Sequence, residues 1–165
     1  RAISGLIKLT EGSITVEGKV IGKEIPFPKN LGILIEYPGF IPDYTGYKNL
    51  LFLSMIKNSI GSEEIRKVIE KVGLDPDDKR KFKKYSLGMK QRLGIAQAIM
   101  ENPDLLLLDE PTNALDDKGV IMLINLIREM KMKGSTILIT SHDKDFLKEV
   151  SDCIYTISEG EIKNE

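Results

Sequence analysis

The sequence lacks several features that would define a protein class. It has one cysteine, Cys153, so a disulfide framework and a cysteine-based metal site are excluded, and we expect a reducing, cytoplasmic setting. We find no signal peptide and no apolar run long enough to span a bilayer, so any work at a membrane should go through a partner protein. The formal net charge of −1 gives no electrostatic reason to expect nucleic acid or an anionic lipid surface.

The length and composition indicate one ordinary globular domain. A chain of 165 residues can bury one hydrophobic core, and 41% hydrophobic with 30% charged residues is usual for a soluble protein. Basic residues are concentrated between Lys79 and Lys84. This run allows two interpretations, a basic binding patch or a solvated loop, and we favour the loop because charge runs are usually solvated.

Three apolar segments predict the strands of a sheet. Leu105–Leu108 is a continuous leucine run, which does not alternate as an exposed antiparallel strand would and suits a central strand covered on both faces. Leu31–Ile35 and Thr136–Thr140 have the same character. Helical patterns separate the three, so the predicted fold class is α/β, with a mostly parallel sheet and flanking helices.

Periodicity and turn residues assign the remaining segments. Residues 42–100 have helical character and should form a small helical subdomain, inserted between the sheet-forming parts 1–41 and 101–165 of a single domain, 1–165. Arg1–Lys8 is expected to be the last two turns of a helix. Further helices are expected at 47–55, at 62–72 with Ser62 as N-cap and Gly73 as stop, at 89–100, at 120–133 before Gly134 and at 143–150. A short hairpin or a pair of edge strands is expected at 13–21, around Glu17-Gly18, and a hairpin at 154–162, with its turn at Glu159-Gly160.

Acidic residues and a histidine come where the predicted strands end. Glu36 follows the first strand, Asp109 and Glu110 follow the second, and His142 follows the third. Because open α/β sheets bind ligands at the carboxyl ends of their strands, we expect these side chains to meet at one edge. Asp109 could hold a phosphate-bound Mg²⁺, Glu110 could polarise a water, and His142 could contact a terminal phosphate. Each also has a plainer interpretation, as a loop residue, a helix cap or a structural histidine.

Ser86 and Gly88 precede the helix that we expect to begin at Met89. Ser86 is a suitable N-cap, because the first amide groups of a helix need acceptors. A hydroxyl, a glycine that allows close approach and a positive helix end also suit an anion. The two interpretations are compatible, and local spacing does not choose between them.

Four ordered motifs, spread over essentially the whole chain, resemble the ATP-binding cassette of an ABC transporter. Tyr85–Arg92 resembles the signature motif and the start of its helix. Leu105–Glu110 resembles the Walker B strand with its catalytic glutamate, Asn113–Asp116 resembles the D-loop, and His142 resembles the switch histidine. The resemblance implies a fold like that of the P-loop NTPases.

The resemblance implies an ATP and Mg²⁺ site at the strand ends. In it Glu110 would be the general base or water-positioning residue, and His142 would sense the γ-phosphate. Asp109 and Glu36 would contact Mg²⁺. Most members of the family have glutamine where Glu36 stands, so this chain adds negative charge beside Asp109 and Glu110, which should favour either a bound metal or a raised pKa.

The resemblance also implies contacts with a second cassette in a head-to-tail dimer. Ser86 and Gly88 would bind the nucleotide held by that partner, and Asp116 would relay between the two sites. Leu87 and Met89 replace the glycine and glutamine that are usual in the signature, so Ser86 and Gly88 remain as the matched phosphate contacts.

The implied partner outside the dimer is a transmembrane permease, docked on residues 42–100. The chain would then lie on the inner face of the plasma membrane through that permease, without inserting itself and without binding nucleic acid. The Tyr85–Met89 form and the Glu36–Pro38 segment most resemble the bacterial drug and peptide exporters, including bacitracin-type and lantibiotic-type systems.

The largest departure from the family is that no G-x-x-x-x-G-K-[ST] phosphate loop occurs in the sequence. We therefore expect a truncated cassette, whose phosphate loop and N-terminal strands lie upstream of Arg1 and which is inactive alone. Loss of that strand should leave one flank of the Leu105–Leu108 strand unpaired. The alternatives are a non-catalytic, partner-binding module and, less favoured, a soluble ABC ATPase of DNA repair or translation.

Overall fold

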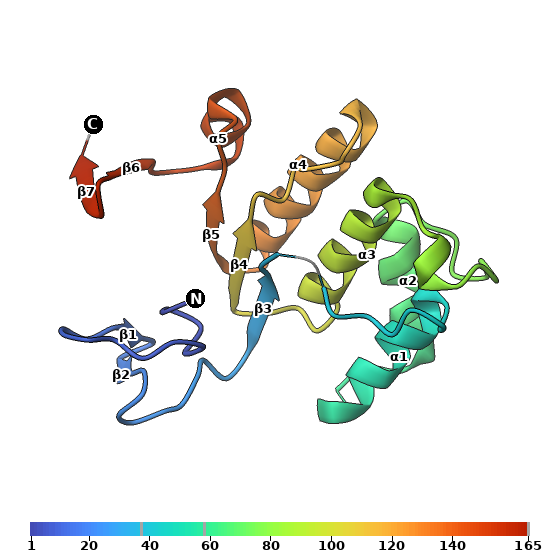
Figure 1. Ribbon diagram of the computed structural model, residues 1–165, viewed down its shortest axis with the longest axis horizontal. Helices are drawn as coiled ribbons and strands as arrows, with labels where there is room; N and C mark the ends of the chain where they lie inside the picture. Colours follow the sequence, from blue (N-terminus) through green and yellow to red (C-terminus); the bar gives the residue numbers. More distant parts are fainter. Residues whose placement is uncertain (37, 58, 165) are drawn as a thin grey trace.

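The computed structural model describes residues 1–36, 38–57 and 59–164. Three parallel strands, β3 (Leu31–Leu34), β4 (Leu105–Asp109) and β5 (Thr136–Thr140), form a sheet in the order β3-β4-β5. Figure 1 shows the sheet at the centre of the molecule, with the arrows of the three strands pointing the same way. The predicted α/β class with a parallel sheet and flanking helices is confirmed. Tyr37, part of the segment compared with exporters, lies outside the described residues.

β4 is the central strand, as its leucine run predicts. It pairs with β3 on one side, Leu34 opposite Leu108, and with β5 on the other, Asp109 opposite Thr140. The expectation of an unpaired flank on β4 is therefore wrong, because both of its edges are hydrogen-bonded. Within the described part of the chain, β5 pairs with β4 alone.

β5 is less buried than its composition predicts. Its side chains alternate between exposed and half-buried, and Leu138 is 46% exposed. The prediction of a strand buried on both faces is wrong here. An apolar run alone does not show whether both faces are covered, whereas in β4 Leu106, Leu107 and Leu108 are all buried because neighbours cover both faces.

The helical region contains α1 (Gly46–Lys57), α2 (Ser62–Lys71), a short 3₁₀ turn η1 (Phe82–Lys84) and α3 (Leu87–Ile99). Figure 1 shows α1, α2 and α3 gathered on one side of the sheet. Leu50, Ile65 and Leu93, one from each helix, are fully buried in the core. Gly32 on β3 allows α3 to approach closely, because a Cβ there would lie 2.0 Å from the carbonyl oxygen of Ala98.

The ends of the helices differ from the expected ends by a few residues. The N-cap of α2 is Gly61 and not Ser62: the Glu64 carboxylate accepts a hydrogen bond from the Gly61 N–H at 3.0 Å. Gly73, at φ 76°, ends α2 as predicted. The last two helices, α4 (Asp117–Met132) and α5 (Lys144–Val150), begin after Asp116 and Asp143, whose carboxylates accept from the backbone amides of the first turn.

The N-terminal residues form one turn and not the two helical turns expected for Arg1–Lys8. The N–H of Gly5 donates to the Ala2 carbonyl at 3.0 Å, and the N–H of Leu6 donates to the Arg1 carbonyl at 3.2 Å. Gly5 has a φ of 79°, so the pair of bonds ends the turn in the manner of a helix C-terminus. A glycine in the left-handed conformation stops the turn before Lys8.

Two hairpins complete the fold and confirm the predicted turns. β1 (Thr15–Val16) pairs with β2 (Lys19–Val20), and β6 (Tyr155–Ser158) pairs with β7 (Glu161–Asn164). Both two-residue turns, Glu17-Gly18 and Glu159-Gly160, have positive φ at each position, which matches the twist of hairpin strands. Among the described helices, none combines the length and apolarity that crossing a bilayer requires.

Candidate functional site

The parallel sheet brings the ends of its strands to one edge, where Glu110 and His142 meet. The Nε2 of His142 lies 3.5 Å from the Oε1 of Glu110. The His142 side chain is fully exposed, whereas that of Glu110 is 25% exposed. The histidine therefore has no packing role, which disfavours its interpretation as a structural residue. A free imidazole beside a half-buried carboxylate can reach a ligand that binds at this edge.

Asp109, the last residue of β4, is held by the neighbouring strand. The hydroxyl of Thr140 donates a hydrogen bond to its Oδ1. The carboxylate stays exposed and offers the hard oxygen ligands that Mg²⁺ prefers. In the described residues no three side chains of His, Cys, Asp or Glu are grouped to hold a metal alone. Since Mg²⁺ commonly keeps waters and phosphate oxygens beside one or two carboxylates, Asp109 fits a phosphate-bound ion.

Among the described residues, Glu36 makes no hydrogen bond or ion pair with the other predicted site residues. Its carboxylate pairs with the guanidinium of Arg1, and its side chain is 65% exposed. Glu36 has a φ of 57° and lines an open cavity of about 510 Å³ together with Arg1 and Gln97. Arg1 thus offsets the negative charge that Glu36 adds in place of the usual glutamine.

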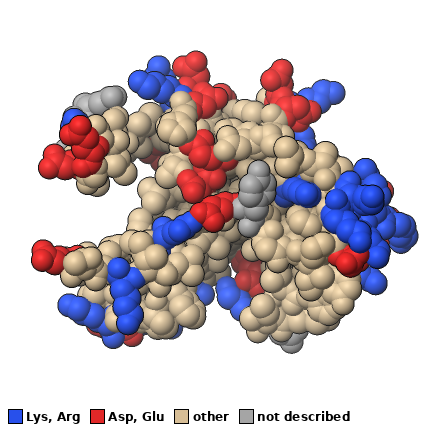
Figure 2. All heavy atoms as spheres, viewed as in Figure 1, with Lys and Arg blue, Asp and Glu red and all other residues tan. Residues whose placement is uncertain are grey.

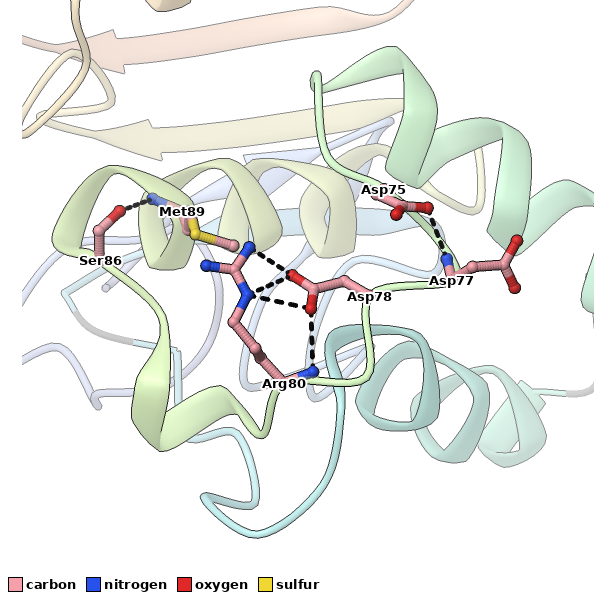
Figure 3. A network of polar contacts seen from close by, with 6 residues as sticks. All are labelled: Asp75, Asp77, Asp78, Arg80, Ser86 and Met89. Atoms are coloured by element: carbon pink, nitrogen blue, oxygen red, sulfur yellow. Dashed lines mark hydrogen bonds and ion pairs between the residues drawn. The ribbon is translucent and has the colours of Figure 1, made fainter.

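The signature residues have structural roles in this chain. The Oγ of Ser86 accepts from the N–H of Met89 at 3.2 Å, so Ser86 is the N-cap of α3, as Figure 3 shows. The helix accordingly begins at Leu87, two residues before the predicted start. Gly88 lies against the D-loop, because a Cβ there would come within 2.8 Å of the carbonyl oxygen of Ala114. Both observations leave the anion-binding interpretation open, since a capped helix start still carries free amides.

The basic run before the signature is an exposed loop with internal ion pairs. Asp43 forms ion pairs with Lys83 at 2.5 Å and with Lys81 at 3.3 Å. The guanidinium of Arg80 donates hydrogen bonds to the Asp78 carboxylate (Figure 3). The Arg80 pairing holds the pKa of Asp78 below its usual value. Figure 2 shows basic side chains gathered over the helical side of the molecule. The geometry supports the favoured interpretation of a solvated loop.

Asp116 caps α4 and pairs with α3. Its carboxylate accepts from the Gly119 N–H at 3.0 Å and from the Arg92 guanidinium at 2.7 Å. The arginine, and then the Gly119 amide, hold the pKa of Asp116 below its usual value. Arg92 also donates to the carbonyl oxygen of Val72 at 2.8 Å, so it joins α2, α3 and the start of α4.

Gln91 is a site residue that the sequence did not single out. Its Nε2 donates to the carbonyl oxygen of Pro111 at 3.0 Å and to that of Glu110 at 3.5 Å. Gln91 and Arg92 lie in the segment Tyr85–Arg92 that resembles the signature motif and the start of its helix, but the sequence gives neither of them a role of its own. The packing of α3 against residues 110–116 gives both residues partners, and the end of α2 gives Arg92 one more.

The fold matches that of a solved ATP-binding cassette. The structure is similar to a dimeric ATP-binding cassette in a post-hydrolysis state bound to ADP and Pi, with a TM-score of 0.87 and 22% identity. The match covers 99% of this chain and 76% of that one. At this identity the likeness shows the fold alone.

The chain is also similar in sequence to ATP-binding proteins of ABC transporters. The chain is 47% identical over 163 residues to the uncharacterized ABC transporter ATP-binding protein YybJ of Bacillus subtilis (strain 168), covering 99% of the chain and 75% of the relative. It is 38% identical to the lantibiotic transport ATP-binding protein SrtF of Streptococcus pyogenes (98% of the chain, 69% of the relative). It is 37% identical to the bacitracin transport ATP-binding protein BcrA of Enterococcus faecalis (94% of the chain, 51% of the relative).

These relatives are longer than the chain, which spans from about half to three quarters of their length. The family model described as ABC transporter matches residues 1–113, more than half of the sequence. The expected resemblance, including its closeness to bacitracin and lantibiotic systems, is confirmed. The chain belongs to the ABC transporter family.

Proposed function

We propose that the protein is the ATP-binding and ATP-hydrolysing subunit of an ABC exporter, which powers transport through a separate permease. The observation that carries the proposal is the meeting of Glu110 and His142 at the sheet edge, beside Asp109 at the end of β4. The names of the relatives, which describe bacitracin and lantibiotic transport ATP-binding proteins, support the transport role.

The chemistry assigned to this edge is attack of a water on the terminal phosphate of ATP. Glu110 accepts a hydrogen bond or a proton from that water, and its partial burial strengthens the interaction. His142 donates a hydrogen bond to the phosphate, where negative charge develops. Asp109, oriented by Thr140, would hold Mg²⁺. When bound, the ion supplies positive charge that offsets the charge of the phosphates.

The signature end of α3 is proposed to serve the ATP of a second cassette. The first amides of α3 point out of the helix at Ser86 and Gly88, and the helix dipole favours an anion there. A serine hydroxyl adds a donor. This role requires a head-to-tail dimer, and the similar solved cassette is itself described as dimeric.

The permease is proposed to dock on α1. Phe52, Met55 and Ile56 are spaced as one helical stripe and are 47%, 58% and 80% exposed. Tyr44 stacks on Phe52, with ring centroids 5.2 Å apart, and extends the apolar surface. An exposed patch of aromatic and methionine side chains is typical of a protein interface. Through it the protein would lie at the inner face of the plasma membrane.

The test is ATP binding and phosphate release by the protein encoded by the complete gene. We expect micromolar binding and measurable turnover, and we expect Glu110→Gln to keep the binding and lose the turnover. Turnover at the normal rate in Glu110→Gln would remove Glu110 from its role, and failure of the complete protein to bind ATP would contradict the whole proposal.

A second measurement addresses the alternative of a non-catalytic, partner-binding module, which is favoured by the missing G-x-x-x-x-G-K-[ST] motif. The chain of 165 residues is expected neither to bind ATP tightly nor to turn it over. Micromolar affinity with turnover by this chain alone would contradict that expectation.

A further inference from the structure

The backbone of Glu110 is held in an unfavourable conformation. Its φ is 47°, in the left-handed region, which is unfavourable for a residue with a Cβ. Such a conformation persists only when its surroundings enforce it. Two backbone bonds contribute: the Glu110 N–H donates to the Thr140 carbonyl at 3.0 Å, and the Asn113 N–H donates to the Glu110 carbonyl at 3.1 Å.

The third restraint comes from a side chain on another element. The Nε2 of Gln91, in the second turn of α3, donates to the carbonyl oxygens of Pro111 and Glu110. Gln91 is half-buried, and Pro111 is fully buried. Within the described part of the chain, no other side chain donates to these two carbonyls. Gln91 therefore bridges α3 and the peptide that follows the Glu110 Cα.

Two neighbouring contacts make α3 and residues 110–116 one packed unit. One turn before Gln91, Gly88 lies against the Ala114 carbonyl, with no room for a Cβ. Beside Gln91, Arg92 binds Asp116 at 2.7 Å. The three contacts follow the segment from Glu110 to Asp116. A displacement of α3 consequently moves the backbone that carries Glu110.

We propose that Gln91 is a positioning residue for Glu110. Through it, the start of α3, which contacts the partner's ATP, sets the orientation of the carboxylate that activates water at the chain's own ATP. This inference rests on the proposed function. It gives α3 a second role: Ser86 and Gly88 sense one nucleotide, and Gln91 conveys the position of the helix to the other site.

The experiment uses Gln91→Leu and Gln91→Glu in the protein encoded by the complete gene. Both substitutions keep approximately the size of the side chain and remove the N–H donors. We expect kcat for ATP hydrolysis to fall about tenfold or more, since small misplacements of catalytic groups are costly. The KM for ATP and the melting temperature should not change, and each variant should retain uncleaved ATP, as Glu110→Gln does.

The matched control is Lys90→Ala, on the same turn of α3. The Lys90 ammonium lies 5.5 Å from the Phe82 ring centroid and, among the described residues, makes no hydrogen bond or ion pair with residues 110–116, so the variant should hydrolyse ATP at the normal rate. An unchanged kcat in both Gln91 variants would overturn the inference, as would a fall in melting temperature and ATP affinity that parallels the loss of rate. If Gln91→Leu does not fold, the same measurements of kcat, KM for ATP and melting temperature on Gln91→Glu test the inference.

The inference and the proposed function fail differently. If Glu110→Gln abolishes turnover and the Gln91 variants are normal, only the inference is wrong. If Glu110→Gln hydrolyses ATP normally, Glu110 has no catalytic role and the inference about Gln91 falls with it. If the complete protein neither binds nor hydrolyses ATP, the proposed function is wrong.

Discussion

Two strands of the sheet end on a carboxylate, and the two ends differ in what surrounds them. Glu36 follows β3 and Glu110 follows β4, and both have a positive φ, 57° and 47°. The Glu36 carboxylate is 65% exposed and pairs with Arg1. The Glu110 carboxylate is 25% exposed and faces His142. Only at Glu110 do bonds from Gln91 hold the following peptide in place.

The difference shows that a carboxylate at a strand end is not by itself a catalytic residue. The Glu36 carboxylate is already engaged by the guanidinium of Arg1. Glu110 has no Lys or Arg partner among the described residues, and its backbone is restrained from β5 and from α3. Central placement in the sheet gives β4 neighbours on both sides and makes that restraint possible.

The largest expected effect is the difference in ATPase rate between a substitution at Glu110 and one at Glu36. In the protein encoded by the complete gene, Glu110→Gln should lower the rate of ATP hydrolysis by about a hundredfold or more, because it removes the general base. Glu36→Gln restores the residue usual in the family and should change the rate by no more than about threefold, since an exposed ion pair contributes little. Phosphate release at saturating ATP measures both. Equal losses in the two variants would show that the ends are equivalent.

The next effect concerns His142, which is found at the Glu110 end alone. His142→Ala should slow hydrolysis by more than about tenfold, because one donor to the developing charge is lost. Its full exposure means that the melting temperature should not change. A normal rate would leave the histidine without a role in turnover, and Glu110 would then differ from Glu36 only in its restraints.

A smaller effect is expected from the hydroxyl that orients Asp109. Thr140→Val keeps the shape of the side chain and removes the hydrogen bond to Asp109. The Mg²⁺ concentration that gives half of the maximal ATPase rate should rise by about three- to tenfold, as one hydrogen bond to a charged group is lost. Ser141→Ala, on the neighbouring position of the chain, is the control. An unchanged Mg²⁺ requirement would separate Asp109 from metal binding.

The smallest effect should come from Asp116, which resembles Glu36 in having a guanidinium partner. Its pKa is held below the usual 3.8, chiefly by Arg92. A carboxylate with a lowered folded pKa stabilises the fold above its unfolded pKa, and this stabilisation is lost as the pH falls through the folded pKa. Asp116→Asn keeps a helix cap. The free energy of unfolding, measured with a denaturant, should therefore fall less steeply below about pH 4 in the variant than in the wild type. Identical pH dependence of stability in the variant and the wild type would argue against a stabilising ion pair between Asp116 and Arg92.

Much of the fold could be predicted from local sequence. The leucine run of β4, the glycine after α2 and the two-residue turns of both hairpins act through burial, backbone conformation and hydrogen bonding over a few residues. The predictions that fail depend on distant neighbours. Leu138 is exposed because β5 has less cover than its apolar run implies. The first turn stops at Gly5, which packs against a distant part of the chain, since a Cβ there would lie 2.3 Å from the carbonyl oxygen of Pro26.

The candidate site shows the same division. The sequence by itself determined that carboxylates and a histidine follow three apolar strands, since residue type and order are local properties. Only the tertiary structure decided which of them act together: it placed His142 beside Glu110, paired Glu36 with Arg1, and gave Gln91 the carbonyls of Glu110 and Pro111. Such contacts join residues far apart in the chain, and no local pattern encodes the packing of α3 against the end of β4.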